Sequence, residues 1–85
     1  MLEIKKKYFI DLNLVDPNGN RIGLIVEEVE LNGEFGYLVI ATRNERPYGP
    51  GQKHRLFKDR KTRDFMLAKR IKNSHKRFLR NIRNG

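Results

Sequence analysis

The sequence predicts an α+β domain: a three- to four-stranded antiparallel sheet in the order β-β-β-(β)-α, with one long C-terminal amphipathic basic helix packed on one face. Three observations support this fold class. Apolar and polar residues alternate in the first half of the chain, an Asn-Gly dipeptide at 32–33 marks a hairpin, and residues 59–83 carry apolar residues at helical spacing. A chain of 85 residues makes one domain with a thin core. We therefore expect residues 1–57 to form the sheet and loop, and residues 59–83 the basic helix.

The first predicted strand precedes a turn at residues 16–20. Its apolar residues lie two apart, as in a strand with one buried face, and they are Tyr8, Ile10, Leu12 and Leu14. Pro17 presets one turn dihedral, and the Asn-Gly that follows accepts positive φ at low cost. We therefore expect the strand to end here.

The second predicted strand, residues 21–31, changes the parity of its apolar residues partway. A bulge near residues 27–28 would return them to one face, and they are Ile22, Leu24, Val26, Val29 and Leu31. The Asn-Gly dipeptide at 32–33, flanked by apolar alternation, is a strong hairpin signal. The third strand then covers residues 34–43.

That hairpin fixes a register, because a slip of one residue would turn every side chain over. The predicted inner-face pairs are Leu31 with Glu34, Val29 with Gly36, Val26 with Leu38, Leu24 with Ile40, and Ile22 with Thr42. The opposite, open face would carry Phe35, Tyr37, Val39 and Ala41 from the third strand, and Arg21, Ile25, Glu30 and either Glu27 or Glu28 from the second.

Residues 44–52 are predicted to form a loop, because two prolines and two glycines exclude a regular central strand. Residues 53–57 could return as a short fourth strand. A helix begins next, with Asp59 or Thr62 as its N-cap and Asp64 in the first turn, where an acid complements the helix dipole.

The predicted helix has an apolar and a cationic side. At 100° per residue the apolar side fills an arc of roughly 120°, and it contains Leu67, Ala68, Ile71, His75, Phe78, Leu79 and Ile82. The cationic side contains Lys69, Arg70, Lys72, Lys76, Arg77, Arg80 and Arg83. No glutamate lies four residues before any of these cations, so the usual ion pairs between neighbouring turns are missing.

Charge is distributed unevenly along the chain, whose formal net charge is +9. Residues 1–52 contain six Lys or Arg and eight Asp or Glu, a balance of −2, whereas residues 53–85 contain thirteen and two, a balance of +11. Such asymmetry indicates a polyanion-binding element attached to a nearly neutral scaffold.

Three interpretations compete for the cationic side of the helix. If it lies against nucleic-acid phosphates, five or six contacts would give a log–log salt slope of about −4 to −5. A membrane-surface helix would turn its apolar side to lipid, but the sheet needs that side, since a hairpin alone is marginal in water. An ordinary solvated face would mix both signs of charge. We therefore favour nucleic acid, and single-stranded DNA or RNA in particular.

The loop adds candidates outside the helix. Tyr48 could stack on a base, while Arg46, Lys53 and Arg55 hold phosphates. The alternative is that the tyrosine packs locally in an ordinary hairpin connection.

The open sheet face adds two aromatic candidates. Phe35 and Tyr37 could stack on bases, as in several folds that bind single strands. The alternative is that this exposed apolar face forms a homodimer interface.

The sequence does not predict an enzyme. His54, which lies between Lys53 and Arg55, could act as general base in a small RNase of the toxin type, whereas His75 is expected to be a packed core residue. The chain has no cysteine, so neither a disulfide nor a thiolate zinc site is expected. No nucleotide-binding or hydrolase motif occurs. We expect no cofactor and no metal.

In its strand-then-helix order and basic character, the chain is similar in architecture to small sheet-plus-helix proteins that bind single strands, of the whirly and Pur-alpha kind. It is also similar to a double-stranded-RNA-binding domain in its sheet and last helix, but it lacks room for that family's first helix. The likeness rests on no shared motif and carries over no residue roles.

The sequence thus predicts a non-enzymatic nucleic-acid-binding protein that uses a basic helix and a basic Gly/Pro loop. The predicted binding residues are Arg46, Tyr48, Lys53, Arg55, Lys69, Lys72, Lys76, Arg77, Arg80, Arg83, Tyr37 and Phe35. The alternatives are an RNase that uses His54 and an assembly subunit whose basic helix docks an acidic protein. No apolar run approaches the roughly 18–20 residues of a membrane span, and the N-terminus carries acids instead of a signal-peptide pattern. We therefore expect a cytoplasmic protein that does not bind a membrane.

Overall fold

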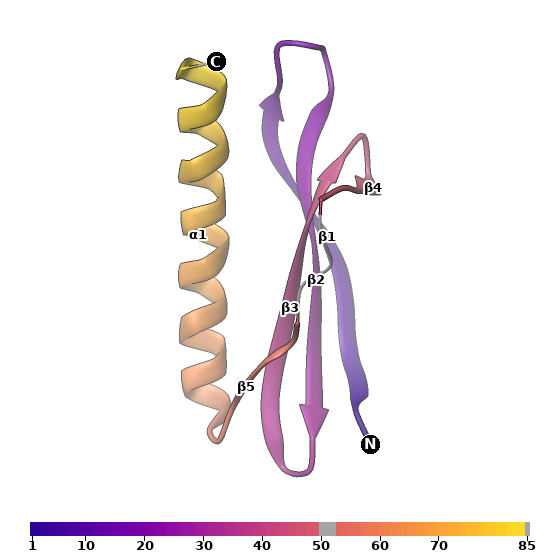
Figure 1. The fold of residues 1–85 in the computed structure, drawn as a ribbon. Coiled ribbons are helices and arrows are strands. Elements are labelled where there is room, and N and C mark those ends of the chain that lie inside the picture. Colours follow the sequence, from indigo (N-terminus) through magenta and orange to yellow (C-terminus); the bar gives the residue numbers. More distant parts are fainter. Residues whose placement is uncertain (50–52, 85) are drawn as a thin grey trace.

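A computed structural model describes residues 1–49 and 53–84. It has two layers, an antiparallel sheet and one helix that lies along it (Figure 1). The elements are β1 (Glu3–Val15), β2 (Arg21–Leu31), β3 (Glu34–Arg43), β4 (Arg46–Pro47), β5 (Arg55–Phe57) and α1 (Arg60–Asn84). The predicted α+β fold, with a long C-terminal helix against the sheet, is confirmed.

Strands β1, β2 and β3 are sequential antiparallel neighbours, and β4 and β5 both pair with β3. Strand β5 is the predicted short fourth strand. The sequence did not predict β4, which lies in the expected loop and whose Pro47 is tolerated because β4 is an edge strand. Residues 50–52 of that loop lie outside the described residues.

The helix extends along nearly the whole molecule. Its 25 residues span about 37 Å, against a longest molecular extent of 42 Å. Its first residues lie near the β2–β3 hairpin, and its C-terminal end lies beside the β1–β2 turn (Figure 1). The two ends of α1 therefore meet opposite ends of the sheet.

The β2–β3 hairpin forms as predicted. Asn32 and Gly33 both have positive φ, 50° and 79°, which is the type I′ pattern that matches the strand twist. Leu31 faces Glu34 and Val29 faces Gly36, again as predicted.

The predicted bulge in β2 is wrong. Strand β2 pairs with β3 without a shift, so that the observed pairs are Ile22 with Arg43, Leu24 with Ala41, and Val26 with Val39. The irregularities lie instead where β1 pairs with β2, at residues 4–6 and 11–14. Asn13, with φ 58°, is in the second of them.

This difference of one residue inverts the predicted faces of β3. Tyr37, Val39 and Ala41 face α1, whereas Leu38 and Ile40 face away from it. Because both parities of β3 are apolar, the alternation that normally fixes a register did not distinguish the two faces.

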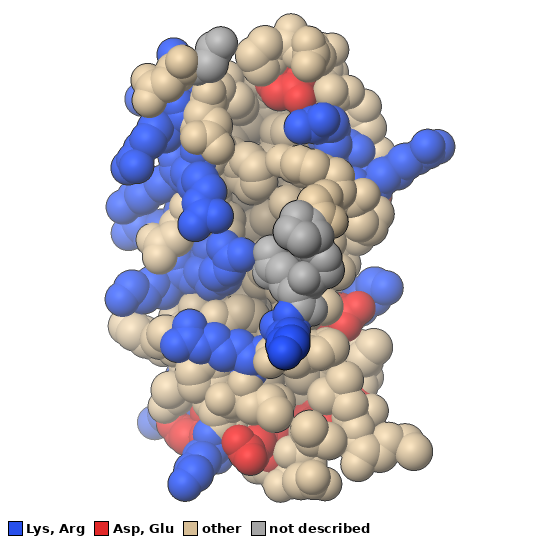
Figure 2. All heavy atoms as spheres, in the orientation of Figure 1, with Lys and Arg blue, Asp and Glu red and all other residues tan. Residues whose placement is uncertain are grey.

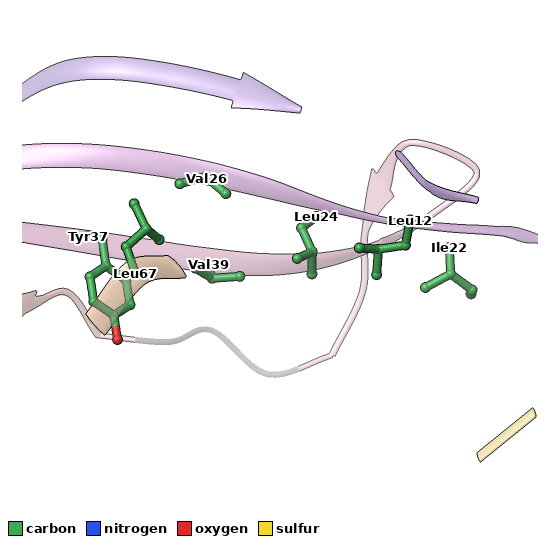
Figure 3. Close-up of a cluster of buried hydrophobic side chains, with 7 residues drawn as sticks. All are labelled: Leu12, Ile22, Leu24, Val26, Tyr37, Val39 and Leu67. Carbon is green, nitrogen blue, oxygen red and sulfur yellow. The ribbon is translucent and has the colours of Figure 1, made fainter. Parts of the chain in front are cut away.

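The core lies between the sheet and α1, and Figure 3 shows its buried side chains along the strands. Its buried side chains come from three strands and the helix, and they are Leu12, Ile22, Leu24, Val26, Tyr37, Val39 and Leu67. Tyr8, Ile10 and Leu14 pack against this cluster, which confirms the predicted buried face of β1. Full burial of such a side chain contributes roughly 1.5–3 kcal/mol.

Asp59 caps the helix, as one of the two predicted N-caps. Its Oδ2 accepts hydrogen bonds from the Thr62 backbone N–H at 3.1 Å and from the Thr62 hydroxyl at 2.8 Å. The hydroxyl bond, more than the others, lowers the pKa of the Asp59 carboxyl. Asp64 does not lie in the first turn, so that prediction is wrong, and its carboxylate contacts Arg63 instead.

The buried side of α1 is wider than the predicted apolar side. Of the predicted residues only Ala68 is exposed, while Leu67 is buried and the others are half-buried. Arg63 and Ser74 are buried as well. The prediction missed these two because it counted only apolar residues.

Arg63 anchors the first turns of α1 to the sheet. Its side chain is 5% exposed, and its guanidinium donates a 3.0 Å hydrogen bond to the Gly36 carbonyl. Its Nη2 lies 3.6 Å from Oε1 of Glu28, whose other oxygen accepts the Tyr8 hydroxyl at 3.1 Å. Burial and this bond to a carboxylate raise the pKa of Tyr8 to about 12. One network thus joins α1, β1, β2 and β3.

Candidate nucleic-acid interface

The exposed side of α1 carries a straight line of cations. This cationic row consists of Lys69, Lys72, Lys76, Arg80 and Arg83, all of them exposed. The row fills an arc of roughly 80° and extends about 21 Å along the helix. Like charges three or four residues apart destabilise a helix slightly, so folding alone does not account for the row.

The cationic row has no acidic partner within residues 1–49 and 53–84. The ion pairs there join Lys5 to Glu3 and Glu30, Lys7 and His54 to Glu27, Arg21 to Asp11, Arg43 to Asp16, and Arg63 to Glu28 and Asp64. Most of the acidic side chains in residues 1–49 therefore already form ion pairs with cations outside the row. The charge of the row is left to solvent and to ligands.

Figure 2 shows the resulting distribution of charge on one side of the molecule. Lys and Arg gather along α1, on the left of the view, while Asp and Glu lie near the lower end and over the sheet. A surface of one sign raises the local concentration of oppositely charged ligands and speeds their association.

Two further cations of the predicted cationic side lie at the boundary between helix and sheet. Arg70 is half-buried and donates a 2.7 Å hydrogen bond to the Ser74 hydroxyl. Arg77 is exposed, and both arginines border a cavity of about 60 Å³ whose lining includes Leu24 and Ala41. The predicted cationic side is thus divided into the cationic row and this boundary pair.

A groove of about 250 Å³ lies between the C-terminal half of α1 and the β1–β2 turn. Residues from the turn, β2, β3, the segment after β4, and α1 line it: Asp16, Pro17, Asn18, Ile22, Arg43, Tyr48, Phe78, Asn81 and Ile82. Of these, only Tyr48 was predicted to bind a ligand. Arg43 and Asn81 were missed, because no local pattern shows that a strand end and a helix side meet here.

Tyr48 forms one wall of the groove and is held on two sides. Its backbone N–H donates to the Ala41 carbonyl at 3.1 Å. The Arg43 guanidinium carbon lies 4.4 Å from the centre of its ring, and Arg43 Nε lies 3.6 Å from an Asp16 oxygen. The Tyr48 ring thus packs locally against Arg43, as the alternative prediction for this residue expected.

The other predicted loop cations are exposed but spread along β3. Arg46 lies in β4 and pairs opposite Arg43, whereas Arg55 lies in β5 opposite Tyr37. Six residues of strand separate these positions, or roughly 20 Å. Arg46 therefore lies at the end of β3 that carries the groove residue Arg43, while Arg55 lies near its other end. Lys53 is exposed and precedes β5.

The prediction of an open aromatic face on β3 is wrong. Tyr37 is 5% exposed, and its ring stacks on Phe57 at 5.9 Å in the layer beneath α1. No face of this ring is left for a base. Phe35 is half-buried on the same side, where it lines a hollow with Arg60 and Arg63. Both errors follow from the inverted assignment of the two faces of β3.

The face of the sheet away from α1 carries a row of apolar residues, of which Ile25 was predicted there and Phe9 and Ile40 were not. Phe9, Ile25 and Ile40 lie directly across β1, β2 and β3, and Phe9 is 43% exposed. Gly23 makes room for this ring, since a Cβ there would lie 2.6 Å from a Phe9 carbon. A homodimer through this open face stays a prediction.

His54 also lies on the side away from α1. Its Nε2 is 3.4 Å from Glu27 Oε1, and Lys7 Nζ is 3.7 Å from the other Glu27 oxygen. The structure therefore does not bring His54 together with the cationic row. The RNase alternative would need its phosphate beside a carboxylate.

Within the described ranges, no three His, Cys, Asp or Glu side chains are placed to hold a metal ion. The described part of the chain also contains no helix with the length and apolarity required to cross a bilayer.

Comparisons of the chain with protein-family models, with curated proteins and with solved structures found no match in any of the three.

Proposed function

We propose that this protein binds single-stranded nucleic acid through the cationic row of α1, without catalysing a reaction on it. The observation that carries the proposal is that five exposed cations share one side of a helix, and none has an acidic partner within the described residues.

Phosphates are the counterpart that best accounts for such a row. Each contact with a nucleic-acid phosphate releases condensed counterions, so that five contacts on a single strand give a log–log salt slope of about −3.5. An acidic protein surface would also neutralise the charge, but it carries no comparable layer of condensed ions. The salt slope therefore separates these two ligands.

A flexible single strand suits the row better than a duplex does. The row is straight over about 21 Å, and a single strand can follow it. Single-strand binding typically combines a basic surface with an aromatic side chain, and half-buried Tyr48 lies at the end of the molecule where the row ends.

The test is fluorescence anisotropy with a labelled single-stranded oligonucleotide at several salt concentrations. Changing Lys76→Glu together with Arg80→Glu removes two contacts from the middle of the row. We expect the slope to fall by about 1.4 in magnitude and the affinity to fall at least about 25-fold at 0.1 M salt. The same samples on a gel report cleavage of RNA, which the RNase alternative requires and this proposal does not expect.

The matched control is Lys6→Glu with Lys61→Glu. It changes the net charge by the same amount, and both residues are exposed but lie outside the row. Equal losses in the two double variants would mean that overall charge, and not the row, determines binding. Tight binding to an acidic protein with a shallow salt slope, and none to oligonucleotides, would favour the assembly subunit instead.

A further inference from the structure

We infer that the groove beside Tyr48 is a subsite for one unpaired nucleobase, next to the cations that hold the phosphates. This inference deepens the proposed function and rests on it. It names the part of the nucleotide that enters the protein and the residues that receive it.

The size and floor of the groove suit a single planar ring system. Its volume is about 250 Å³, just below the roughly 300–1,000 Å³ of sites for drug-sized ligands. The floor is apolar: Ile22 is 3% exposed, and Phe78 and Ile82 are half-buried beside it. The face of a base is the part of a nucleotide that gains most from such a surface.

The wall of the groove offers two planar groups for stacking. Tyr48 is fixed by its bond to Ala41, and the Arg43 guanidinium lies over its ring at 4.4 Å. Bases in single strands stack on tyrosine rings and on arginine planes alike. At the rim, the amides of Asn18 and Asn81 can each donate to and accept from the edge of a base.

Charge decides which part of the nucleotide enters. Asp16 lines the groove with its side chain 11% exposed, and the Asn20 backbone N–H in particular lowers its pKa. Both carboxylate oxygens already accept hydrogen bonds, so Asp16 keeps its negative charge at neutral pH and opposes a phosphate inside the groove.

A cation outside the groove attracts that phosphate instead. Arg77 is exposed, lies four residues before Asn81 on the same side of α1, and borders a cavity together with Phe78. A base in the groove with its neighbouring phosphate on Arg77 satisfies both parts of a nucleotide. Because the base must be unpaired to enter, a duplex cannot use the subsite.

The experiment compares two single-stranded probes that carry the same number of phosphates, an oligothymidylate and an abasic oligonucleotide of the same length. We expect the wild type to prefer the thymidylate roughly 5- to 150-fold, which corresponds to one stacked base. Tyr48→Ala should abolish most of this preference and leave the salt slope unchanged, while Tyr48→Phe should retain the preference. Lys76→Glu with Arg80→Glu should lower the affinity for both probes by the same factor.

A second measurement needs no variant. One 2-aminopurine in an otherwise abasic oligonucleotide has no neighbouring base to stack on, so quenching of its emission on binding reports stacking on the protein. Unchanged emission, or equal wild-type affinity for both probes with a steep salt slope, overturns the base subsite and leaves the proposed function standing. The absence of salt-dependent binding to either probe overturns the proposed function itself.

Discussion

Replacing Arg63 with methionine should lower the free energy of unfolding by about 3 kcal/mol. Methionine keeps much of the apolar stem of the side chain but has no guanidinium. The Arg63 side chain is 5% exposed and joins α1 to both β2 and β3, so little solvent is available to replace its partners.

The magnitude follows from three contacts of unequal weight. The 3.0 Å bond to the Gly36 carbonyl involves a charged donor and contributes roughly 1.5–3 kcal/mol. Glu28 would lose its counter-charge at 3.6 Å, but it is 19% exposed and keeps the Tyr8 hydroxyl. Removing the counter-charge of Glu28 therefore lowers the free energy of unfolding by about 1 kcal/mol, below the 3–5 kcal/mol of a fully buried pair. Asp64 is 55% exposed, and such a surface pair contributes little.

Urea unfolding followed by far-UV circular dichroism measures this change, and an unchanged m-value shows that the two-state analysis holds. In a thermal melt the same loss lowers Tm by roughly 12–24 °C for a domain of this size. Arg63→Lys, which keeps the charge but not the planar fork, should lose less. A loss below about 1 kcal/mol in Arg63→Met would refute the reasoning, because it would mean that desolvating the guanidinium offsets its contacts.

Two further predictions concern the helix start and the open face. Asp59→Ala should lower Tm by roughly 4–8 °C through loss of the N-cap. Asp59→Asn should retain most of the stability that the cap contributes, because asparagine also caps helices. Because the folded pKa of Asp59 is below 3.8, the contribution of the carboxylate is present above that pH and is lost as the pH falls through the folded value. Asp59→Ala with an unchanged melt would contradict the capping role. For the homodimer, sedimentation equilibrium should give a dimer for the wild type and a monomer for Phe9→Lys, with the nucleic-acid salt slope retained. A wild type that is monomeric at all concentrations would exclude this interface.

Local patterns predicted the elements well because each depends on neighbouring residues. Asn32-Gly33 specifies its turn through positive φ, and Asp59 specifies a helix start through its side chain. The faces of β3 were predicted wrongly because they depend on where α1 packs. The helix covers the face of β3 that carries Tyr37. Because β3 has apolar residues on both faces, its sequence cannot indicate which face a helix will cover.

The candidate site was only partly predictable for the same reason. A cationic helix side without acids can be read directly from residues 69–83, and the cationic row lies there. The groove combines Asp16, Arg43 and Asn81, which are far apart in the sequence. Buried Arg63 was missed because an arginine is expected at the surface unless its partners are known.

The helix is held to the sheet unevenly, and this bears on how a ligand would act. Its buried residues, Arg63, Leu67 and Ser74, all lie in its first fifteen positions. The last ten positions, which carry three of the five cations of the row, are held by half-buried Phe78, Leu79 and Ile82. Regions with fewer buried side chains open at lower free energy. A ligand that bridges the row and the groove would therefore stabilise the C-terminal half most. It follows that Arg63→Met should weaken the fold while leaving the salt slope of binding unchanged, because the buried contact that anchors the helix is separate from the exposed contacts that hold the ligand.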